Sequence, residues 1–339
     1  MNGYQRIKAA LNGERSDTIP VLLHNFQMAA FEAGFTMAEY RESPRNIADS
    51  FIQAIEKYNY DGILVDLDTS TLAGAIGVPV DFPKDEPARV HDPLLTTLDN
   101  FEYIQDVVVR DYKYVQIWCE AVKLVKEYFK DEKYVRGNCD QAPFSLASML
   151  RTPQEWLMDL LMNEEKALEL LDLCAGLTSQ LIVAMAESGC DMVSNGDSPA
   201  GPDMISPDMY KKFALPYERR VIEVAHKAGV DYTLHICGNT TAILEPFSTS
   251  GADALEVDYK TDSLKACEVL KDKLTFIGNI DPSSVLALGS VDDVKRETET
   301  LLKIFADNPR FILNAGCSIP PQTPSENIKA LIDTARNFY

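Results

Sequence analysis

The segment LTFIGNID, residues 274–281, has an apolar centre and a polar end. Short apolar runs of this kind are typical of parallel strands that are buried on both faces. The run FILNA at residues 311–315 repeats the pattern. Long helical patterns separate such runs along the chain, and this alternation predicts βαβ units around a parallel sheet.

Outward from this segment, eight strands are expected in all. They lie at residues 19–25, 62–68, 134–140, 191–197, 232–237, 254–258, 274–280 and 311–315. Helical patterns lie between and after them, at about 46–60, 98–129, 153–188, 207–228, 240–250, 263–271, 291–308 and 325–338. Eight such units favour an α/β fold of the closed (β/α)8 kind, a TIM barrel, as one catalytic domain of residues 1–339. The competing dinucleotide-binding fold needs a glycine-rich turn after its first strand, and the chain has no GxGxxG motif. The proline-rich segment 77–93 is expected to form a surface loop near the barrel mouth.

The charge of the chain excludes several classes of partner. Lys and Arg number 32 and Asp and Glu number 52, which gives a formal net charge of −20. Nucleic-acid backbones and anionic membranes both need a surplus of basic residues, so we expect neither as a partner. The first residues lack the basic start and apolar run of a signal peptide, and no apolar run is long enough to span a membrane. The seven cysteines are an odd number at irregular spacing, which indicates reduced thiols and predicts a cytoplasmic protein.

Polar residues follow the apolar centres of most predicted strands. In a closed barrel the carboxyl ends of all strands meet at the catalytic face. Asp and Asn also begin turns and cap helices, but His, Cys and Glu are poor turn formers. We therefore take the acidic residues Asp68, Glu256 and Asp281 as candidate catalytic groups. The candidate substrate-binding residues are His24, Asn25, Asn138, Asn195, Asp197 and Asn279.

One histidine and two cysteines form a candidate metal site. His235 and Cys237 are two residues apart on a predicted strand, so both side chains project from one face. Cys317 follows the last predicted strand. A His/Cys/Cys set suits Zn²⁺, and three protein ligands leave an open position of the catalytic kind. The alternative is that these residues are buried parts of the core. That interpretation is preferred for four other cysteines, which lie in or beside helical patterns: Cys119, Cys174, Cys190 and Cys267. Cys139, at a strand end, stays open between the two interpretations.

Several segments together resemble the uroporphyrinogen decarboxylase superfamily. They are HICGNT at 235–240, GNIDP at 278–282, NAGC at 314–317, ISP at 205–207, PY at 216–217 and QAPFSLA at 141–147. The HxC pair with a distant Cys resembles the corrinoid-dependent methyltransferase branch, typified by methylcobalamin:coenzyme M methyltransferases. The resemblance implies a single (β/α)8 barrel and a zinc ion held by His235, Cys237 and Cys317. It also implies a thiol that binds zinc and accepts a methyl group, and a corrinoid (methylcobalamin) carried by a partner protein.

The chain departs from the decarboxylases at one segment. Those enzymes carry arginines just after the first strand, whereas PVLLHNFQMA at 20–29 contains none. A tetrapyrrole with eight carboxylates needs several cationic partners, so uroporphyrinogen is a poor candidate substrate. The catalytic Asp of the decarboxylases has a counterpart in Asp68.

Four hypotheses remain open from the sequence. The first is methyl transfer from a methylated corrinoid to a thiol. The second is the reverse direction, in which a methoxy compound gives its methyl group to Co(I). The third is a metal-free decarboxylase that uses Asp68. The fourth is a protein that binds a corrinoid or tetrapyrrole without catalysis.

Overall fold

Eight strands form one parallel sheet that closes on itself. The computed structural model describes residues 1–339 and orders the strands β1-β2-β5-β6-β7-β8-β9-β10. Val21 forms a parallel bridge with Leu313, next to the Leu313 N–H, which donates to the Pro20 carbonyl at 2.9 Å. This contact joins the first strand to the last, so the predicted (β/α)8 barrel is confirmed. The strands are β1 (Leu22–Leu23), β2 (Gly62–Val65), β5 (Tyr134–Gln141), β6 (Met192–Gly196), β7 (Asp231–Ile236), β8 (Ala254–Val257), β9 (Thr275–Ile280) and β10 (Phe311–Ala315).

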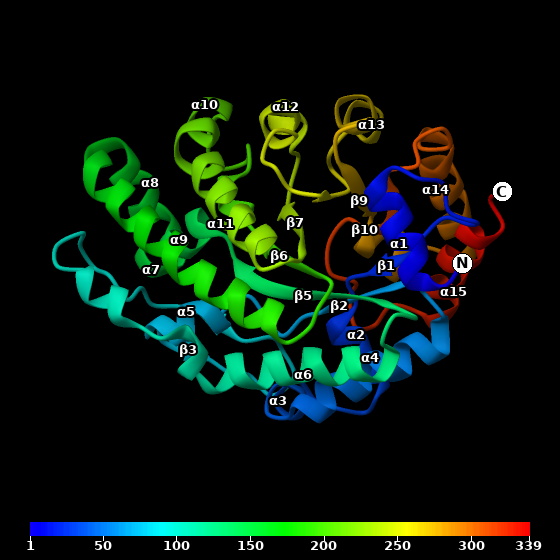
Figure 1. The fold of residues 1–339 in the computed structure, drawn as a ribbon, viewed down its shortest axis with the longest axis horizontal. Coiled ribbons are helices and arrows are strands. Elements are labelled where there is room, and N and C mark those ends of the chain that lie inside the picture. The colour runs from blue at the N-terminus through cyan, green and yellow to red at the C-terminus, as the bar shows by residue number, and fades with distance from the viewer.

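The helices surround this sheet (Figure 1). The α-helices are α1 (Gly3–Asn12), α2 (Phe26–Glu32), α3 (Met37–Arg41), α4 (Pro44–Tyr58), α5 (Thr71–Ile76), α6 (Lys113–Phe129), α7 (Pro143–Arg151), α8 (Pro153–Met162), α9 (Glu164–Glu187), α10 (Pro207–Met209), α11 (Leu215–Lys227), α12 (Leu244–Phe247), α13 (Ser263–Leu270), α14 (Val291–Ile304) and α15 (Ser325–Arg336). Shorter helical turns are η1 (Glu102–Asp106), η2 (Val109–Asp111), η3 (Ser198–Ala200), η4 (Tyr210–Ala214), η5 (Thr241–Ile243) and η6 (Pro282–Ala287). A small antiparallel hairpin, β3 (Val80–Asp81) with β4 (Arg89–Val90), lies within the proline-rich segment.

Local sequence explains where the helices begin and where two predicted helices are divided. The side chain of Ser43 accepts the Asn46 N–H and caps α4, whose first residue is a proline. The predicted helix 153–188 is instead two helices, because Asn163 adopts a non-helical conformation between them. The predicted helix 98–129 is α-helical only from Lys113 onward. Its first half contains the valines 107–109, whose β-branched side chains disfavour a helix, and it forms η1 and η2.

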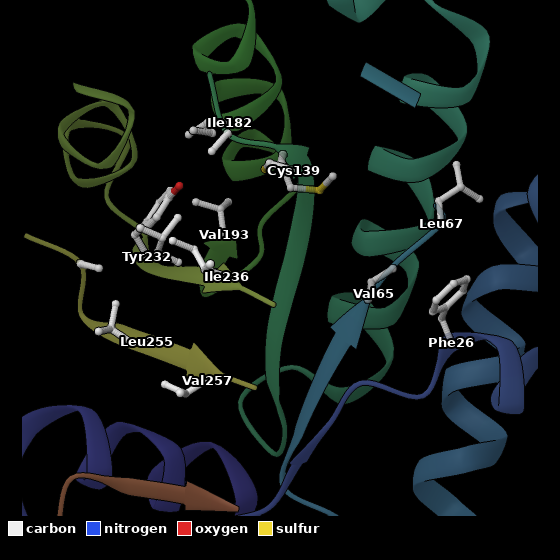
Figure 2. Packing of buried hydrophobic residues seen from close by; sticks show 14 of the residues in the cluster. Phe26, Val65, Leu67, Cys139, Ile182, Val193, Tyr232, Ile236, Leu255 and Val257 are labelled. Carbon is white, nitrogen blue, oxygen red and sulfur yellow. The ribbon is translucent and has the colours of Figure 1, made fainter. Parts of the chain in front are cut away.

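Buried apolar side chains form two separate clusters. The larger cluster fills the space between the sheet and the helices, where Val193, Ile236 and Cys139 lie (Figure 2). The smaller one lies inside the barrel at its amino-terminal end, where Ile7 and Leu11 of α1 pack against residues from the strands. Helix α1 therefore closes the bottom of the barrel, and the opposite end is the open mouth.

Helix α9 is long and apolar enough to cross a membrane by length and composition. In the structure it packs against α7 and α11, and 56% of its most apolar window is buried inside the fold. Its apolar character is thus explained by its place in the helical layer of the barrel.

Candidate active site

A cavity of about 290 Å³ lies at the barrel mouth, at the carboxyl ends of the strands. Most of the residues in its wall are polar or charged, and they come from both ends of the chain. The polar and charged residues that line it are His24, Gln27, Asp66, Asp68, Thr69, Arg136, Asn138, Asp140, Gln141, Asn195, Ser198, His235, Cys237, Glu256, Cys317 and Ser318. Pro87, from the proline-rich segment, also lines the cavity, as expected for a loop at the mouth.

His235, Cys237 and Cys317 meet at one side of this cavity. The His235 Nε2 atom lies 3.0 Å from the Cys237 sulfur, and the two sulfurs are 3.6 Å apart. All three possible ligand atoms lie within 4.8 Å of one another. One imidazole nitrogen and two sulfurs at this spacing match the donor set of a tetrahedral Zn²⁺ site with an open position.

Neighbouring groups orient these three side chains. The Nδ1 atom of His235 is 3.1 Å from the Glu256 carbonyl oxygen, which fixes Nδ1–H as the donor and leaves Nε2 free for a metal. The Cys237 N–H donates to the Ser198 hydroxyl at 3.2 Å. The hydrogen bond with Cys317 and the nearby His235 lower the pKa of the Cys237 thiol. The hydrogen bond with Cys237 and burial raise the pKa of the Cys317 thiol.

A buried charge network lies next to His235, Cys237 and Cys317. Arg136 pairs with Glu256, and the His24 Nε2 atom lies 2.8 Å from Asp66 Oδ2. Asn138 donates to the other Asp66 oxygen at 2.8 Å. Burial raises the pKa of Glu256, but Arg136 and the two histidines hold it well below its usual range. Burial lowers the pKa of His24, but its hydrogen bond with Asp66 and the nearby Glu256 carboxylate raise it to about 9. The two acids of this network are thus balanced by two cations.

Two further carboxyl groups, of Asp68 and Asp140, line the cavity without a cation beside them. Asp68 Oδ1 accepts the Ser70 N–H at 2.8 Å and the Thr71 hydroxyl at 2.9 Å. Asp140 Oδ2 accepts the Leu72 N–H at 2.7 Å. Burial raises the pKa of Asp68 to about 6 and raises that of Asp140 as well. Neither carboxyl group takes part in an ion pair.

Comparisons with known proteins identify the family of this barrel. A model of the family described as uroporphyrinogen decarboxylase (URO-D) matches residues 3–338. The chain belongs to the URO-D family. A methyltransferase from Methanosarcina mazei has the same fold, with a TM-score of 0.92 and 23% identity over 100% of this chain and 99% of that one.

Relatives within this URO-D group include both methyltransferases and decarboxylases. Methylcobamide:CoM methyltransferase MtbA of Methanosarcina acetivorans is 31% identical over 65% of this chain, and the match spans 62% of the relative's length. Methylcobamide:CoM methyltransferase MtaA of Methanosarcina barkeri is 26% identical over 98% of this chain and 97% of its own length. Uroporphyrinogen decarboxylase of Thermus thermophilus is 25% identical over 88% of this chain and 86% of its own.

The URO-D barrel brings most of the predicted site residues together. Along with the three metal-site residues, the cavity wall includes Asp68, Glu256, His24, Asn138 and Asn195. Sequence reasoning missed Asp66, Arg136 and Asp140, which also line it. The signal for the last two was the alternation of strand side chains, because positions 136, 138 and 140 share one face of β5. Cys139, on the other face, is fully buried in the larger apolar cluster between the sheet and the helices and is a core residue.

Four predicted residues are not on the cavity wall. Asp281 caps η6 by accepting the N–H groups of the two serines that follow Pro282. Asn279 is bonded to the Ser263 hydroxyl and to the Asp258 carbonyl. These two side chains serve the turn and cap functions that Asp and Asn commonly have.

The other two are engaged with residues behind the wall. The Asn25 amide lies 3.3 Å from the Tyr60 hydroxyl. Asp197 Oδ1 accepts both the N–H and the hydroxyl of Ser145, at 2.8 and 2.6 Å. Their side chains support the loops around the site and do not reach the cavity.

Proposed function

We propose that this URO-D family protein transfers a methyl group between a methylated corrinoid and a small thiol. The observation that carries the proposal is the convergence of one imidazole nitrogen and two sulfurs at the edge of a small cavity. The full-length similarity to MtaA supports the same class of reaction.

The residues of the chain fit a zinc ion. Two sulfurs and one Nε2 supply a soft donor set, and the Nδ1 bond to the Glu256 carbonyl is the outer contact that zinc-binding histidines commonly make. When bound by His235, Cys237 and Cys317, zinc would lower the pKa of a substrate thiol that occupies its open position.

The size of the cavity indicates how the two reactants are arranged. A volume of about 290 Å³ is at the lower end of the range for small-molecule sites. A thiol of a few carbons fits inside it, whereas a corrin ring must stay outside, over the mouth. This arrangement supports a corrinoid carried by a partner protein.

The reaction balances with one thiol proton. A bond forms between the thiol sulfur and the methyl carbon, the carbon–cobalt bond breaks, and its electron pair stays on cobalt, which passes from Co(III) to Co(I). The thiol proton leaves to solvent. Glu256 cannot receive it, because Arg136 and the histidines keep that carboxyl group ionised at neutral pH.

The decarboxylase hypothesis is less well supported. Arg136 is the sole arginine that lines the cavity, and it is already paired with Glu256. Eight substrate carboxylates would therefore meet carboxylates of the protein. We expect no coproporphyrinogen from uroporphyrinogen.

The test is demethylation of methylcobalamin by zinc-loaded protein with a panel of thiols. The change in cobalamin absorbance reports the reaction. Calorimetry of thiol binding in buffers of different ionisation enthalpy checks the central step, because a thiol that binds as its anion must release a proton. We expect a heat that varies with the buffer. Demethylation of methoxy compounds onto Co(I) cobalamin, with no reaction of any thiol, would instead favour the second hypothesis.

A further inference from the structure

The two unbalanced carboxyl groups lie across the mouth from the metal ligands. Asp68 follows β2 and Asp140 belongs to β5, and these strands are neighbours in the sheet. Cys237 follows β7 and Cys317 follows β10, with β8 and β9 between them. In a closed ring of eight strands, the point between β2 and β5 is opposite the point between β8 and β9. A substrate atom held by the metal ligands therefore has its remaining atoms directed toward Asp68 and Asp140.

The cations around the cavity are paired with groups other than these two carboxyl groups. Asp66 is paired with His24, and Glu256 is paired with Arg136. Arg41 is the cation that acts on Asp68 through space, but its guanidinium donates to the carbonyl oxygens of Pro83 and Glu86. Asp68 and Asp140 have no cationic partner in the protein.

Hydrogen bonding gives an independent indication of a ligand. Asp140 is only 2% exposed, yet its Oδ1 atom has no hydrogen-bond partner. A buried carboxylate oxygen without a donor is unfavourable, and native proteins commonly reserve such a group for a bound molecule. Because Asp140 lines the cavity, that donor can come from a molecule inside it.

We propose that Asp68 and Asp140 bind a cationic N–H donor at the end of the substrate away from its sulfur. The inference rests on the proposed function and names the substrate class as an aminothiol. An ammonium group supplies both the charge and the N–H bonds that this side lacks. A mercaptosulfonate would instead place its anion against two carboxyl groups, because the cations His24 and Arg136 of the cavity wall are paired with Asp66 and Glu256.

Burial agrees with this assignment. It raises the pKa of both carboxyl groups, as expected for acids held in a site that lacks its cation. An ammonium group beside them would restore the ionised form.

The experiment compares two matched series of thiols of two to four carbons, one ending in an ammonium group and one in a sulfonate. We expect kcat/KM for the best aminothiol to exceed that of the best sulfonate by about tenfold or more. Asp140→Asn is expected to lower kcat/KM for the aminothiol by about tenfold, mainly through KM, and to leave the sulfonate series unchanged or improved. Asp68→Asn is expected to act in the same direction.

The variants are chosen to preserve the fold. Asn can still accept the Leu72 N–H, and it tolerates the positive φ of 58° at position 140. Asp307→Asn removes a fully exposed carboxylate and is the matched control, which we expect to keep the substrate preference of the wild type.

A direct binding measurement separates this inference from the proposed function. Calorimetry with n-propylammonium, which has no sulfur, should show binding to the wild type and at least tenfold weaker binding to Asp140→Asn. If no thiol reacts but propylammonium binds in this way, the proposed function is wrong and the ammonium site stands. A preference for sulfonates that Asp140→Asn leaves unchanged, or equal binding of propylammonium to both proteins, overturns the inference.

Discussion

The two sides of the barrel mouth are built alike, from residues at the ends of strands, but they carry different chemical groups. On each side, inward-facing residues at the end of a strand meet residues from a second strand. Between β7 and β10 these residues are soft donors, and their ligand atoms face one another within 4.8 Å. Around β2 and β5 they are carboxyl groups. One oxygen of each accepts a backbone N–H from the segment at the start of α5. The spacing on the first side suits a single ion, whereas on the second side the Asp140 Oδ1 atom has no hydrogen-bond partner.

One ion pair connects the two sides below the cavity. Arg136 is on β5 and Glu256 is on β8, and their side chains are 2% and 1% exposed. The backbone carbonyl of Glu256 orients His235, while Arg136 lies one inward-facing position below Asn138. The pair therefore fixes the position of β5, which carries Asp140, relative to His235 on β7.

Removing a metal ligand should have the largest effect. We expect His235→Ala and Cys317→Ala each to lower zinc affinity and methyl transfer by more than about a hundredfold, because even outer contacts of zinc ligands contribute 10–100-fold. Zinc content after dialysis against a chelator, together with the methylcobalamin assay, measures both losses.

The matched control is Cys267→Ala, which removes a half-buried thiol on α13 that bonds to the Ile304 carbonyl. Its zinc content and activity should equal those of the wild type. Full zinc occupancy in His235→Ala would show that the ligand assignment is wrong.

Breaking the connecting ion pair should have the next largest effect. Arg136→Met leaves the Glu256 carboxylate buried without its main partner, and we expect the free energy of unfolding to fall by about 3–5 kcal/mol. Urea denaturation followed by circular dichroism measures the change.

The double variant Arg136→Met/Glu256→Gln tests the reason for that loss. Because it removes the unpaired charge, it should recover at least half of the stability. A double variant as unstable as the single one would show that the loss comes from packing.

Asp68 should give the smallest change, and its sign depends on pH. Burial raises its pKa from 3.8 to about 6 in the folded protein, so the unfolded chain loses the proton at a lower pH than the folded one. The wild type therefore loses stability as pH rises from about 4 to 6, and stays at the lower level above that range. Asp68→Asn should be more stable than the wild type by about 1–3 kcal/mol at pH 8, with little difference at pH 4.

Thermal unfolding from pH 4 to pH 8 measures this effect. A stability difference that stays constant over that range would mean that Asp68 does not titrate there, and that the carboxylate side is less shielded from water than its burial indicates.

The barrel and the pairing of His235 with Cys237 were predictable from the sequence because both depend on short-range patterns. Apolar runs place the strands, and the two-residue spacing of His235 and Cys237 places both side chains on one face. The predicted site residues that do not line the cavity are all Asp or Asn, which occur at strand ends for local reasons as well. Asp281 and Asn279 lie in the same kind of segment as Asp68, and the sequence offers no means to tell a cap from a wall residue.

The missed residues depend on contacts between distant strands. Arg136 is a charged residue in a strand of apolar neighbours, and its partner Glu256 is 120 positions away. Charge balance in the cavity could be assessed only after these pairs were known. The proposed role of Asp140 therefore comes from the structure, although its alternation with Arg136 and Asn138 was visible in the sequence.

Helix α1 also constrains the order of events during synthesis. Its apolar face contacts Ile312 of β10, and the Leu11 carbonyl bonds to Arg310, 299 residues later. At ~5–20 residues per second, ribosomes need roughly 15–60 s to reach that point. During this time the first helix of the chain has no complete surface to pack against. Nascent chains should thus expose this amphipathic segment until the last strand emerges, which makes α1 a target for chaperones.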